Sequence, residues 1–375
     1  MRDGLPDGLP NGLRQGPRHD RGPPFVNPVL VNRWRGNAIE SRHRGAVAVV
    51  DADGQLVLGL GDVQQHVFPR SAVKFLQAVP FVESGAVARY GLDERHVALA
   101  CASHNGEPIH AGLASDWLER IGLDQDDLEC GAELPMHKAT QFELMSAGRG
   151  PQRVHHNCSG KHLGFLSTCL VHDDPTRDYR RYGHAAQRRW FDVLESVGHA
   201  RVMQLPWGYD GCAIPSLAIP LQRTALMLAR FGQVTRFEGE RRGAVEAIHA
   251  AVTAHPYLVA GKERLCTDLM VRMAPRLLVK VGADGVYTAT STEHGLGIAL
   301  KIDDGSDAAA RVALGAVLAT LGLVDDDDRR ALAEYFMPEL TNSRGEVIGR
   351  SEPSSTWRSI ETVGAGPDDE NADAS

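Results

Sequence analysis

The sequence predicts an α+β fold, in which helices cover an antiparallel sheet and a helical lobe lies beside it. Two observations lead to this prediction. Strand-like segments occur before residue 60 and again between residues 277 and 302, whereas helical periodicity dominates the chain between them. Separate runs of strands and helices are typical of α+β proteins. We therefore expect the first and last strands to pair in one sheet.

The first elements are two apolar strands and a hairpin. Residues 28–31 and 45–50 are rich in β-branched side chains, and the turn sequence Asp-Ala-Asp-Gly at 51–54 leads into a third apolar segment at 55–59. Such a turn between two apolar runs predicts a β-hairpin. Residues 71–82 then show apolar side chains at helical spacing, so Ser71 is expected in the first turn of a helix.

The remaining elements follow from the same periodicities. The middle of the chain has three clear helical patterns, at 116–121, 182–197 and 217–231. Three apolar strands joined by Gly-containing turns come next, at 277–281, 285–290 and 295–302, and an Ala/Leu/Val-rich helix closes the pattern at 306–323. These segments supply the second half of the expected sheet and a helix to cover it.

The composition along the chain suggests one folded domain between two tails. The N-terminus is rich in Gly, Pro, Asp and Arg, which is typical of a disordered arm, and from about residue 345 the chain loses periodicity and becomes acidic. The expected divisions are a disordered arm at 1–25, one catalytic domain at 26–325 and a C-terminal extension with an acidic disordered tail at 326–375. Within the domain we expect a sheet lobe (26–95 and 270–325) and a helical lobe (96–269).

Charge and hydropathy exclude several classes of protein. Of the formal net charge of −8, most lies in the last 25 residues, so the body is nearly neutral and offers no basic face to nucleic acid. The chain has no apolar run of about 18 residues, which argues against a membrane span. The N-terminus has no apolar signal-peptide core, and the six cysteines show no disulfide framework. We therefore expect a cytoplasmic protein.

Lysine is scarce, because only six of the 40 Lys and Arg residues are lysines. An arginine keeps its proton in a protein, whereas a buried lysine can work as a base or a metal ligand. Lys74 closes the segment Ser71-Ala-Val-Lys74, and residues three apart share one face of a helix. Ser71 and Lys74 could therefore form a nucleophile and its base. Chance pairing with a helix-capping serine is the alternative.

A second serine and a third lysine strengthen the catalytic interpretation. Ser103-His-Asn105 follows an apolar run and has the spacing of the middle motif of serine β-lactamases and penicillin-binding proteins, where a serine relays protons and an asparagine holds the substrate amide. Lys280-Val-Gly282 lies where the Lys-Thr-Gly strand of those enzymes would be. Three motifs in this order predict a Ser–Lys site. A loop serine and asparagine with a lysine at a strand end would be the structural alternative.

Cys158, Lys161 and Cys212 form a second candidate site. Together they could give three ligands to Zn²⁺ and leave a fourth position for water or substrate, with Asp210 beside them. Lysine binds a metal only as the neutral amine, so this set needs an unusual pocket. Buried thiols, or an anion cradled by Gly160 and Lys161, are the alternatives.

The segment 157–165, Asn-Cys-Ser-Gly-Lys-His-Leu-Gly-Phe, resembles the signature of the rhizobial-type L-asparaginases, a class distinct from the bacterial enzymes with a threonine nucleophile. The resemblance covers about 28–325, and the sequence departs from the family pattern mainly at 128–135 and 260–267. Other stretches that agree are 40–51, 100–107, 210–215, 254–256 and 280–304.

The resemblance implies a serine β-lactamase-like fold, a homodimer, and hydrolysis of L-asparagine to L-aspartate and ammonia. Carried over by position, Ser71 with Lys74 and Ser103 with Lys280 are two Ser–Lys pairs, and Cys158, Lys161 and Cys212 are zinc ligands. In that family the zinc is thought to hold substrate rather than to perform the chemistry. Asn105 and Asp210 are the expected substrate contacts.

The sequence does not decide which serine attacks the substrate. Two other functions stay open: a penicillin-recognising type of serine amidase or peptidase, and a non-catalytic protein that binds zinc or an amino acid.

Overall fold

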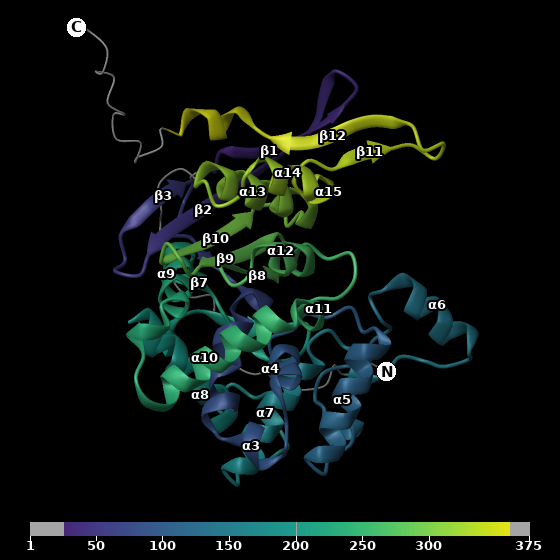
Figure 1. Ribbon diagram of the computed structural model, residues 1–375, viewed down its shortest axis with the longest axis vertical. Helices are drawn as coiled ribbons and strands as arrows, with labels where there is room; N and C mark the ends of the chain where they lie inside the picture. Colours follow the sequence, from purple (N-terminus) through teal and green to yellow (C-terminus); the bar gives the residue numbers. More distant parts are fainter. Residues whose placement is uncertain (1–25, 200, 361–375) are drawn as a thin grey trace, which may run out of the picture.

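The computed structural model describes residues 26–199 and 201–360, and its central feature is a sheet of eight strands in which every pairing is antiparallel (Figure 1). Seven strands follow the order β11-β12-β1-β2-β10-β9-β8, and β3 pairs with β2. The strands are β1 (Val29–Arg35), β2 (Ala38–Asp51), β3 (Leu56–Leu60), β8 (Leu277–Gly282), β9 (Val286–Ser291), β10 (Leu296–Ile302), β11 (Glu339–Thr341) and β12 (Val347–Pro353).

Fifteen α-helices and two small strand pairs complete the described part of the chain. The strand pairs are β4 (His66–Val67) with β7 (Ile219–Pro220) and β5 (Trp207–Tyr209) with β6 (Pro215–Leu217). The helices are α1 (Lys74–Gln77), α2 (Val79–Glu83), α3 (Ala86–Arg89), α4 (Glu94–Ala100), α5 (Pro108–Arg120), α6 (Lys138–Ser146), α7 (Ser159–Val171), α8 (Ala185–Gly198), α9 (Leu221–Gly232), α10 (Gly239–Ala254), α11 (Pro256–Val259), α12 (Leu265–Met273), α13 (Asp307–Thr320), α14 (Asp326–Ala331) and α15 (Ala333–Phe336).

The α+β prediction is confirmed, and so is the pairing of the first and last strands. β2 and β10 pair from Gly45↔Ile302 to Asp51↔Leu296. The first half of β2 alternates between exposed and half-buried side chains, whereas residues 45–50 are all buried, because helices cover both faces there. Val47 and Val49 point into the main core, and the intervening residues of β2 pack on α9 on the opposite face.

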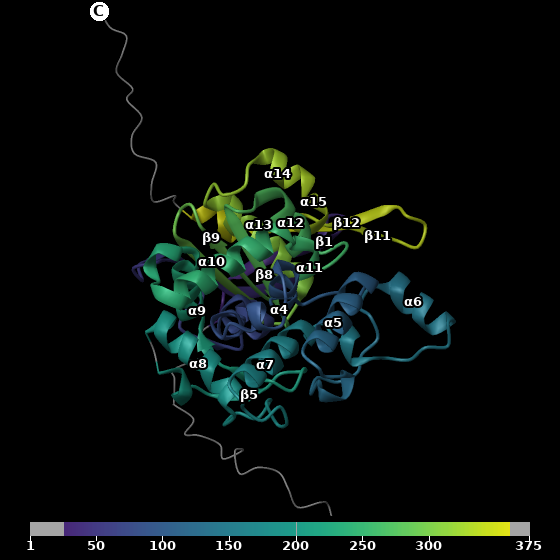
Figure 2. The same cartoon turned by 60° about the horizontal axis from the view of Figure 1, so that its bottom comes forward.

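The helices between the two halves of the sheet lie mostly to one side of it. Figure 1 shows α3, α4, α5, α7, α8 and α10 below the strands, and Figure 2 shows α6 projecting from the margin of this group. The predicted hairpin after β2 is confirmed by the pairing of β2 with β3. The predicted division into two lobes within one domain stays a prediction.

Two expectations about elements need correction. The segment 71–82 is not one helix but a 3₁₀ turn, η1 (Arg70–Val73), followed by α1 and α2. Pro80, near the start of α2, has no N–H for a helical hydrogen bond, which favours this break. Ser71 therefore lies in a 3₁₀ turn rather than in an α-helix.

The folded part also extends past residue 325, and residues from 345, which the sequence assigned to a tail, include strand β12. β12 pairs with β1, and the indole of the buried Trp357 donates to the backbone oxygen of Leu30 over 2.9 Å. β12 has only one buried side chain, so its apolar pattern is weak. The expected arm at 1–25 and the tail from 361 lie outside the described residues. No helix in the described ranges is long and apolar enough to span a membrane.

Candidate active site

A cleft of about 850 Å³ contains both predicted serines. It is lined by Ser71 from η1, Ser103 from the loop after α4, Gly282 at the end of β8, and the loop that precedes α12, and one wall is the start of α6. The cleft therefore draws on both halves of the sheet region and on the helical insertion. Segments that are far apart in sequence meet here.

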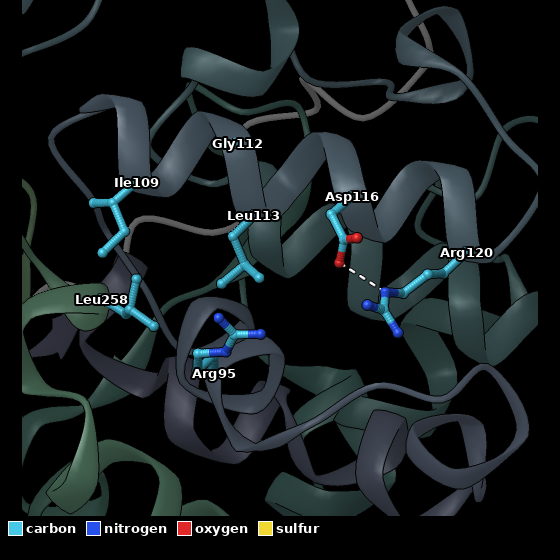
Figure 3. Close-up of a pocket in the computed structure, with 7 residues that line it drawn as sticks. All are labelled: Arg95, Ile109, Gly112, Leu113, Asp116, Arg120 and Leu258. Carbon is cyan, nitrogen blue, oxygen red and sulfur yellow. Dashed lines mark hydrogen bonds and ion pairs between the residues drawn. The ribbon is translucent and has the colours of Figure 1, made fainter.

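A separate hollow of about 310 Å³ lies away from these serines, beside α4 and α5 (Figure 3). Its charged side chains are already engaged with each other or with neighbours, as shown by Arg120, whose Nε donates to Asp116 over 2.7 Å. It has no hydroxyl, thiol or amine side chain that could act as a nucleophile or a base. The lining residues are Arg95, Ile109, Gly112, Leu113, Asp116, Arg120 and Leu258.

The Ser103 hydroxyl lies between two buried lysines. Lys280 Nζ donates to Ser103 Oγ over 2.8 Å, and Lys74 Nζ donates to the same oxygen over 3.1 Å. Both lysines are fully buried, and Ser103 is 7% exposed. Backbone bonds from Ser103 to Val259 and from Asn105 to Ala260 hold this loop in place. The structure thus brings Ser103 and Lys280 together, as the sequence predicted.

The amine of Lys74 contacts Ser103 rather than Ser71, its predicted partner. In the described ranges no hydrogen bond joins these two side chains, and Lys74 contacts Ser103, Cys158 Sγ (3.1 Å) and the backbone oxygen of Ala102 instead. Ser71 is half-buried and faces the cleft. The spacing of three residues predicted that Ser71 and Lys74 lie on one helical turn, but it could not predict that Lys74 contacts Ser103.

Burial and like charge lower the pKa of both lysines. Burial lowers the pKa of Lys280 to about 7, and the nearby positive charges of Lys74 and Arg264 act in the same direction. Burial also lowers the pKa of Lys74, with Lys161 adding to the effect, while Cys158 opposes it. Among the described residues, neither amine has a carboxylate hydrogen-bond partner. A neutral amine at Lys280 is therefore available near neutral pH.

The end of β8 packs tightly on the turn that carries Ser71. A Cβ on Gly282 would lie 2.5 Å from the backbone oxygen of Pro69, closer than real Cβ atoms approach. Only glycine fits at 282 without a shift. This close contact holds the strand that carries Lys280 against the serine turn.

Cys158, Lys161 and Cys212 lie together next to the two lysine–serine contacts. Lys161 Nζ donates to Cys212 Sγ over 3.0 Å, and all three side chains are buried. A hydrogen bond from Cys212 lowers the pKa of Cys158, although burial opposes this, and the positive charges of Lys161 and Lys74 lower it further. Burial works against the charge on Lys161, but Cys158 and Cys212 outweigh burial and raise its pKa.

The chemistry of this donor set fits zinc. The pKa of the Cys158 thiol is lowered, whereas the hydrogen bond to Cys158 and burial raise the pKa of the Cys212 thiol. As donor types, two sulfur atoms and one amine nitrogen suit zinc and leave a fourth position for water or substrate. In the described ranges no group of three or more His, Cys, Asp and Glu could hold a metal, so a metal here would need Lys161 as its third ligand. The buried Lys161 would have to lose its proton to bind.

Asp210 joins this cluster to the serine turn. Its carboxylate accepts from Arg70 Nε over 2.7 Å, and Arg70 Nη1 reaches Asp284 over 2.6 Å. Arg70 immediately precedes Ser71 and has a positive φ of 51°. Arg70 was not among the predicted site residues: its place next to Ser71 is visible in the sequence, but its contact with Asp210 exists only in the folded chain.

The side chain of Asn105 is already engaged within the protein. Its amide nitrogen donates to the backbone oxygen of Lys262 over 2.9 Å and to Glu107 over 3.3 Å, and its oxygen accepts from Arg264 over 2.7 Å. The direct substrate contact expected of Asn105 stays a prediction. Glu107 and Arg264 were not among the predicted site residues: Arg264 lies in the segment 260–267, which differs from the family pattern, and the contact of Glu107 with Tyr257 and Lys262 exists only in the folded chain.

A family model described as "L-asparaginase II" matches residues 31–353. Similar solved structures include "Crystal Structure Analysis of Mglu in its native form", with 13% identity, a TM-score of 0.38 and coverage of 81% of this chain and 71% of that one. Another, "Crystal Structure Analysis of Mglu", has 15% identity, a TM-score of 0.36 and coverage of 83% and 71%. TM-scores this low do not establish a shared fold. No curated protein matches the chain.

Proposed function

This chain belongs to the L-asparaginase II family and is an L-asparaginase, and we propose that it hydrolyses L-asparagine through a serine ester with lysine as the base. The observation that carries the proposal is the hydroxyl of Ser103 held between the buried amines of Lys280 and Lys74. A serine hydroxyl becomes a useful nucleophile only when a nearby base accepts its proton. The two amines at Ser103 provide such a base, and the Ser103 hydroxyl can relay a proton to it from a second serine.

Ser71 is the attacking serine in this proposal. Ser103 is almost fully buried and is held by two lysine amines, so its oxygen is poorly placed to attack a substrate. Ser71 faces the same cleft, and in the described part of the chain neither lysine donates a hydrogen bond to its oxygen. Ser103 then serves as the proton relay between Ser71 and Lys280.

The reaction proceeds in two steps, formation of an ester on Ser71 and hydrolysis of that ester. Ser71 Oγ forms a bond to the side-chain carbonyl carbon of asparagine while its proton passes through Ser103 to the neutral Lys280. The C–N bond then breaks while Lys280 returns a proton to the leaving nitrogen through the same relay. Ammonia departs, and an aspartyl ester of Ser71 remains. Water hydrolyses this ester with the lysine again as base, which releases L-aspartate and restores Ser71.

Cys158, Lys161 and Cys212 are the residues that would hold zinc. A bound zinc would supply positive charge and an open coordination position for water or substrate. The family resemblance supports a role in holding substrate rather than in the chemistry. In this proposal Asp210 orients Arg70 and the Ser71 turn beside that site.

Three further features are proposed on the same resemblance: a serine β-lactamase-like relationship of the fold, assembly as a homodimer, and a cytoplasmic location. The order of Ser71-x-x-Lys74, Ser103-x-Asn105 and Lys280-x-Gly282 supports the first of these. Light scattering of the purified protein tests the second, with a mass of twice 40.6 kDa expected.

A coupled ammonia assay with L-asparagine and L-glutamine side by side tests the function. We expect equal amounts of ammonia and L-aspartate from asparagine with zinc-replete protein. Nitrocefin hydrolysis at a rate comparable with asparagine would instead favour a penicillin-recognising enzyme. Stoichiometric zinc binding without ammonia release between neutral and alkaline pH would leave a non-catalytic binding protein.

A further inference from the structure

Arg264 is a cation in the cleft that has no acidic partner in the described part of the chain. Its Nη1 donates to Asn105 Oδ1 over 2.7 Å, and no ion pair joins it to any carboxylate in the described ranges. An arginine has five N–H donors, so most of this guanidinium is unused. The side chain is half-buried and lines the same cavity as Ser71 and Ser103.

The acids that line this cleft are already paired with other cations. Asp284 accepts from Arg70 over 2.6 Å, and Asp307 lies 3.3 Å from Arg311. Among the described residues, no carboxylate therefore forms a direct ion pair with Arg264, and the nearest buried acid, Glu107, is linked to it only through Asn105. An anion that enters the cleft meets an unpaired guanidinium.

A buried network fixes the position of this guanidinium. Asn105 is held by Glu107 and by the backbone oxygen of Lys262, and Glu107 in turn accepts from Tyr257 Oη and from the backbone N–H of Lys262. Glu107 is only 6% exposed. The chain of contacts therefore runs from a buried carboxylate through the amide of Asn105 to Arg264.

The backbone before Arg264 fits closely onto the same network. Gly261 has a φ of +111°, and a Cβ there would lie 2.4 Å from Glu107 Oε1 and 2.8 Å from Asn105 Nδ2. No other residue fits without displacing these side chains. The loop is therefore preorganised, which reduces the entropy lost when a ligand binds.

The other cations of the cleft are less suited to hold a small anion. The side chain of Lys262 is 59% exposed and lies 3.8 Å from Glu263, and Lys138 is exposed on α6. Arg70 is engaged by both Asp210 and Asp284. Arg264 alone in this comparison combines a fixed position, partial burial and free donors.

We propose that Arg264 is the specificity-determining residue that binds the α-carboxylate of the substrate, with Asn105 and Glu107 as its positioning residues. This inference rests on the proposed function. In asparagine three single C–C bonds separate the α-carboxylate carbon from the reacting carbon, at most about 4 Å. Arg264 lines the same cleft as Ser71, the proposed nucleophile, so the two ends of such a short substrate can both be held there. A planar guanidinium matches a carboxylate with two parallel hydrogen bonds.

The test compares L-asparagine with its α-amide, the diamide of L-aspartic acid, which keeps the reacting side chain but lacks the α-carboxylate. Zinc-replete wild-type protein, Arg264→Gln, Arg264→Lys and Lys262→Gln are assayed on both, with L-aspartate and its α-amide measured as the products. We expect Arg264→Gln to lose about 100-fold in kcat/KM for asparagine, mainly through KM, with less than about a threefold change for the diamide. Arg264→Lys should retain part of the preference, and Lys262→Gln should behave like wild type.

Several outcomes would overturn the assignment. An equal loss on both substrates would make Arg264 a structural residue, and the appearance of the selective loss in Lys262→Gln would move the role to that lysine. A misfolded Arg264→Gln, detected by circular dichroism, leaves the test to Arg264→Lys, whose preference for asparagine over the diamide must fall. Wild-type protein that releases no ammonia from asparagine would reject the proposed function itself, which is a separate result.

Discussion

Lys74 and Lys280 lie on either side of one hydroxyl, and this arrangement makes two charged amines at Ser103 unfavourable. Both side chains are fully buried, and their hydrogen-bond acceptors are hydroxyl, sulfur and backbone oxygen. Besides burial, the positive charge of Lys74 lowers the pKa of Lys280, and the positive charge of Lys161 lowers the pKa of Lys74. The site therefore provides a neutral amine near neutral pH, which is the form that general-base catalysis needs.

The pH dependence of the reaction follows from Lys280. Its pKa is lowered to about 7, and only the neutral amine can accept the proton. We expect kcat/KM for asparagine to rise with pH through about 7 and to fall below it. Lys280→Arg should lose about 1000-fold in kcat, because a guanidinium keeps its proton, while Lys138→Arg on the exposed α6 should not. A flat profile from pH 5 to 9, or near-normal activity of Lys280→Arg, would refute this role.

The metal assignment predicts a separation of binding from chemistry. Cys158→Ser removes one of two sulfur ligands, so the variant should lose stoichiometric zinc, measured by plasma mass spectrometry. KM for asparagine should rise about tenfold or more, and kcat should stay within about threefold. Cys169→Ser, at a buried thiol further along α7, is the matched control and should keep zinc. A fall in kcat with unchanged KM would make the metal part of the chemistry.

At the scale of elements, the decisive contact is between the end of β8 and the turn η1. Strand β8 carries Lys280, η1 carries Ser71, and Gly282 allows the two backbones to meet at Pro69. The loop at 103–105 reaches the same point because it bonds to the backbone of residues 259 and 260. Three short backbone contacts thus fix the positions of Ser71, Ser103 and Lys280 relative to one another.

Gly282→Ala tests this contact. The added Cβ would lie 2.5 Å from a backbone oxygen that cannot rotate away, so β8 or η1 must shift. We expect a loss of about 1–3 kcal/mol in the free energy of unfolding and a larger loss of activity. Gly112→Ala, in α5 with nothing within 4 Å, should instead gain about 0.5–1 kcal/mol. Denaturant titration and the ammonia assay measure both. A stable, active Gly282→Ala would contradict the tight contact.

At the scale of the whole molecule, the sheet brings the two ends of the described chain together. β1 lies between β2 and β12, so residues near 30 and near 350 are neighbours. The site residues come from positions 71, 103, 158, 212 and 280, and the fold gathers them beside this sheet. Loss of the last strand would leave β1 as an unprotected edge.

Truncation tests the contribution of β12. A chain that ends at residue 336 lacks β11, β12 and Trp357, whereas a chain that ends at residue 360 keeps them. Because the shorter chain exposes the hydrogen-bonding groups of β1 and loses a buried tryptophan, we expect it to aggregate or to unfold about 3 kcal/mol more easily than the longer one. Soluble yield and thermal unfolding of the two chains are the measurements. Equal stability would show that β12 is dispensable.

Much of the fold and part of the site could be predicted from the sequence. The strands at 277–302 and the hairpin at 51–54 carry strong period-two and turn signals, so they were found. β12 was missed because it is mostly exposed and has no clear alternation. The pairing of Lys74 with Ser103 could not be found either, because local spacing gives the helical neighbour but not the tertiary one. The role of Arg264 could not be predicted because it depends on contacts with Asn105 and, through it, Glu107, which form only in the folded chain.

The identity of the nucleophile tests the central claim most directly. A diazoketone analogue of L-asparagine alkylates the group that attacks the side-chain carbonyl, and peptide mass spectrometry then locates the label. We expect one label per chain on Ser71, blocked by excess L-aspartate and formed far more slowly in Lys280→Arg. Active-site labelling of Ser103, or of Cys158, with a parallel loss of activity would contradict the account.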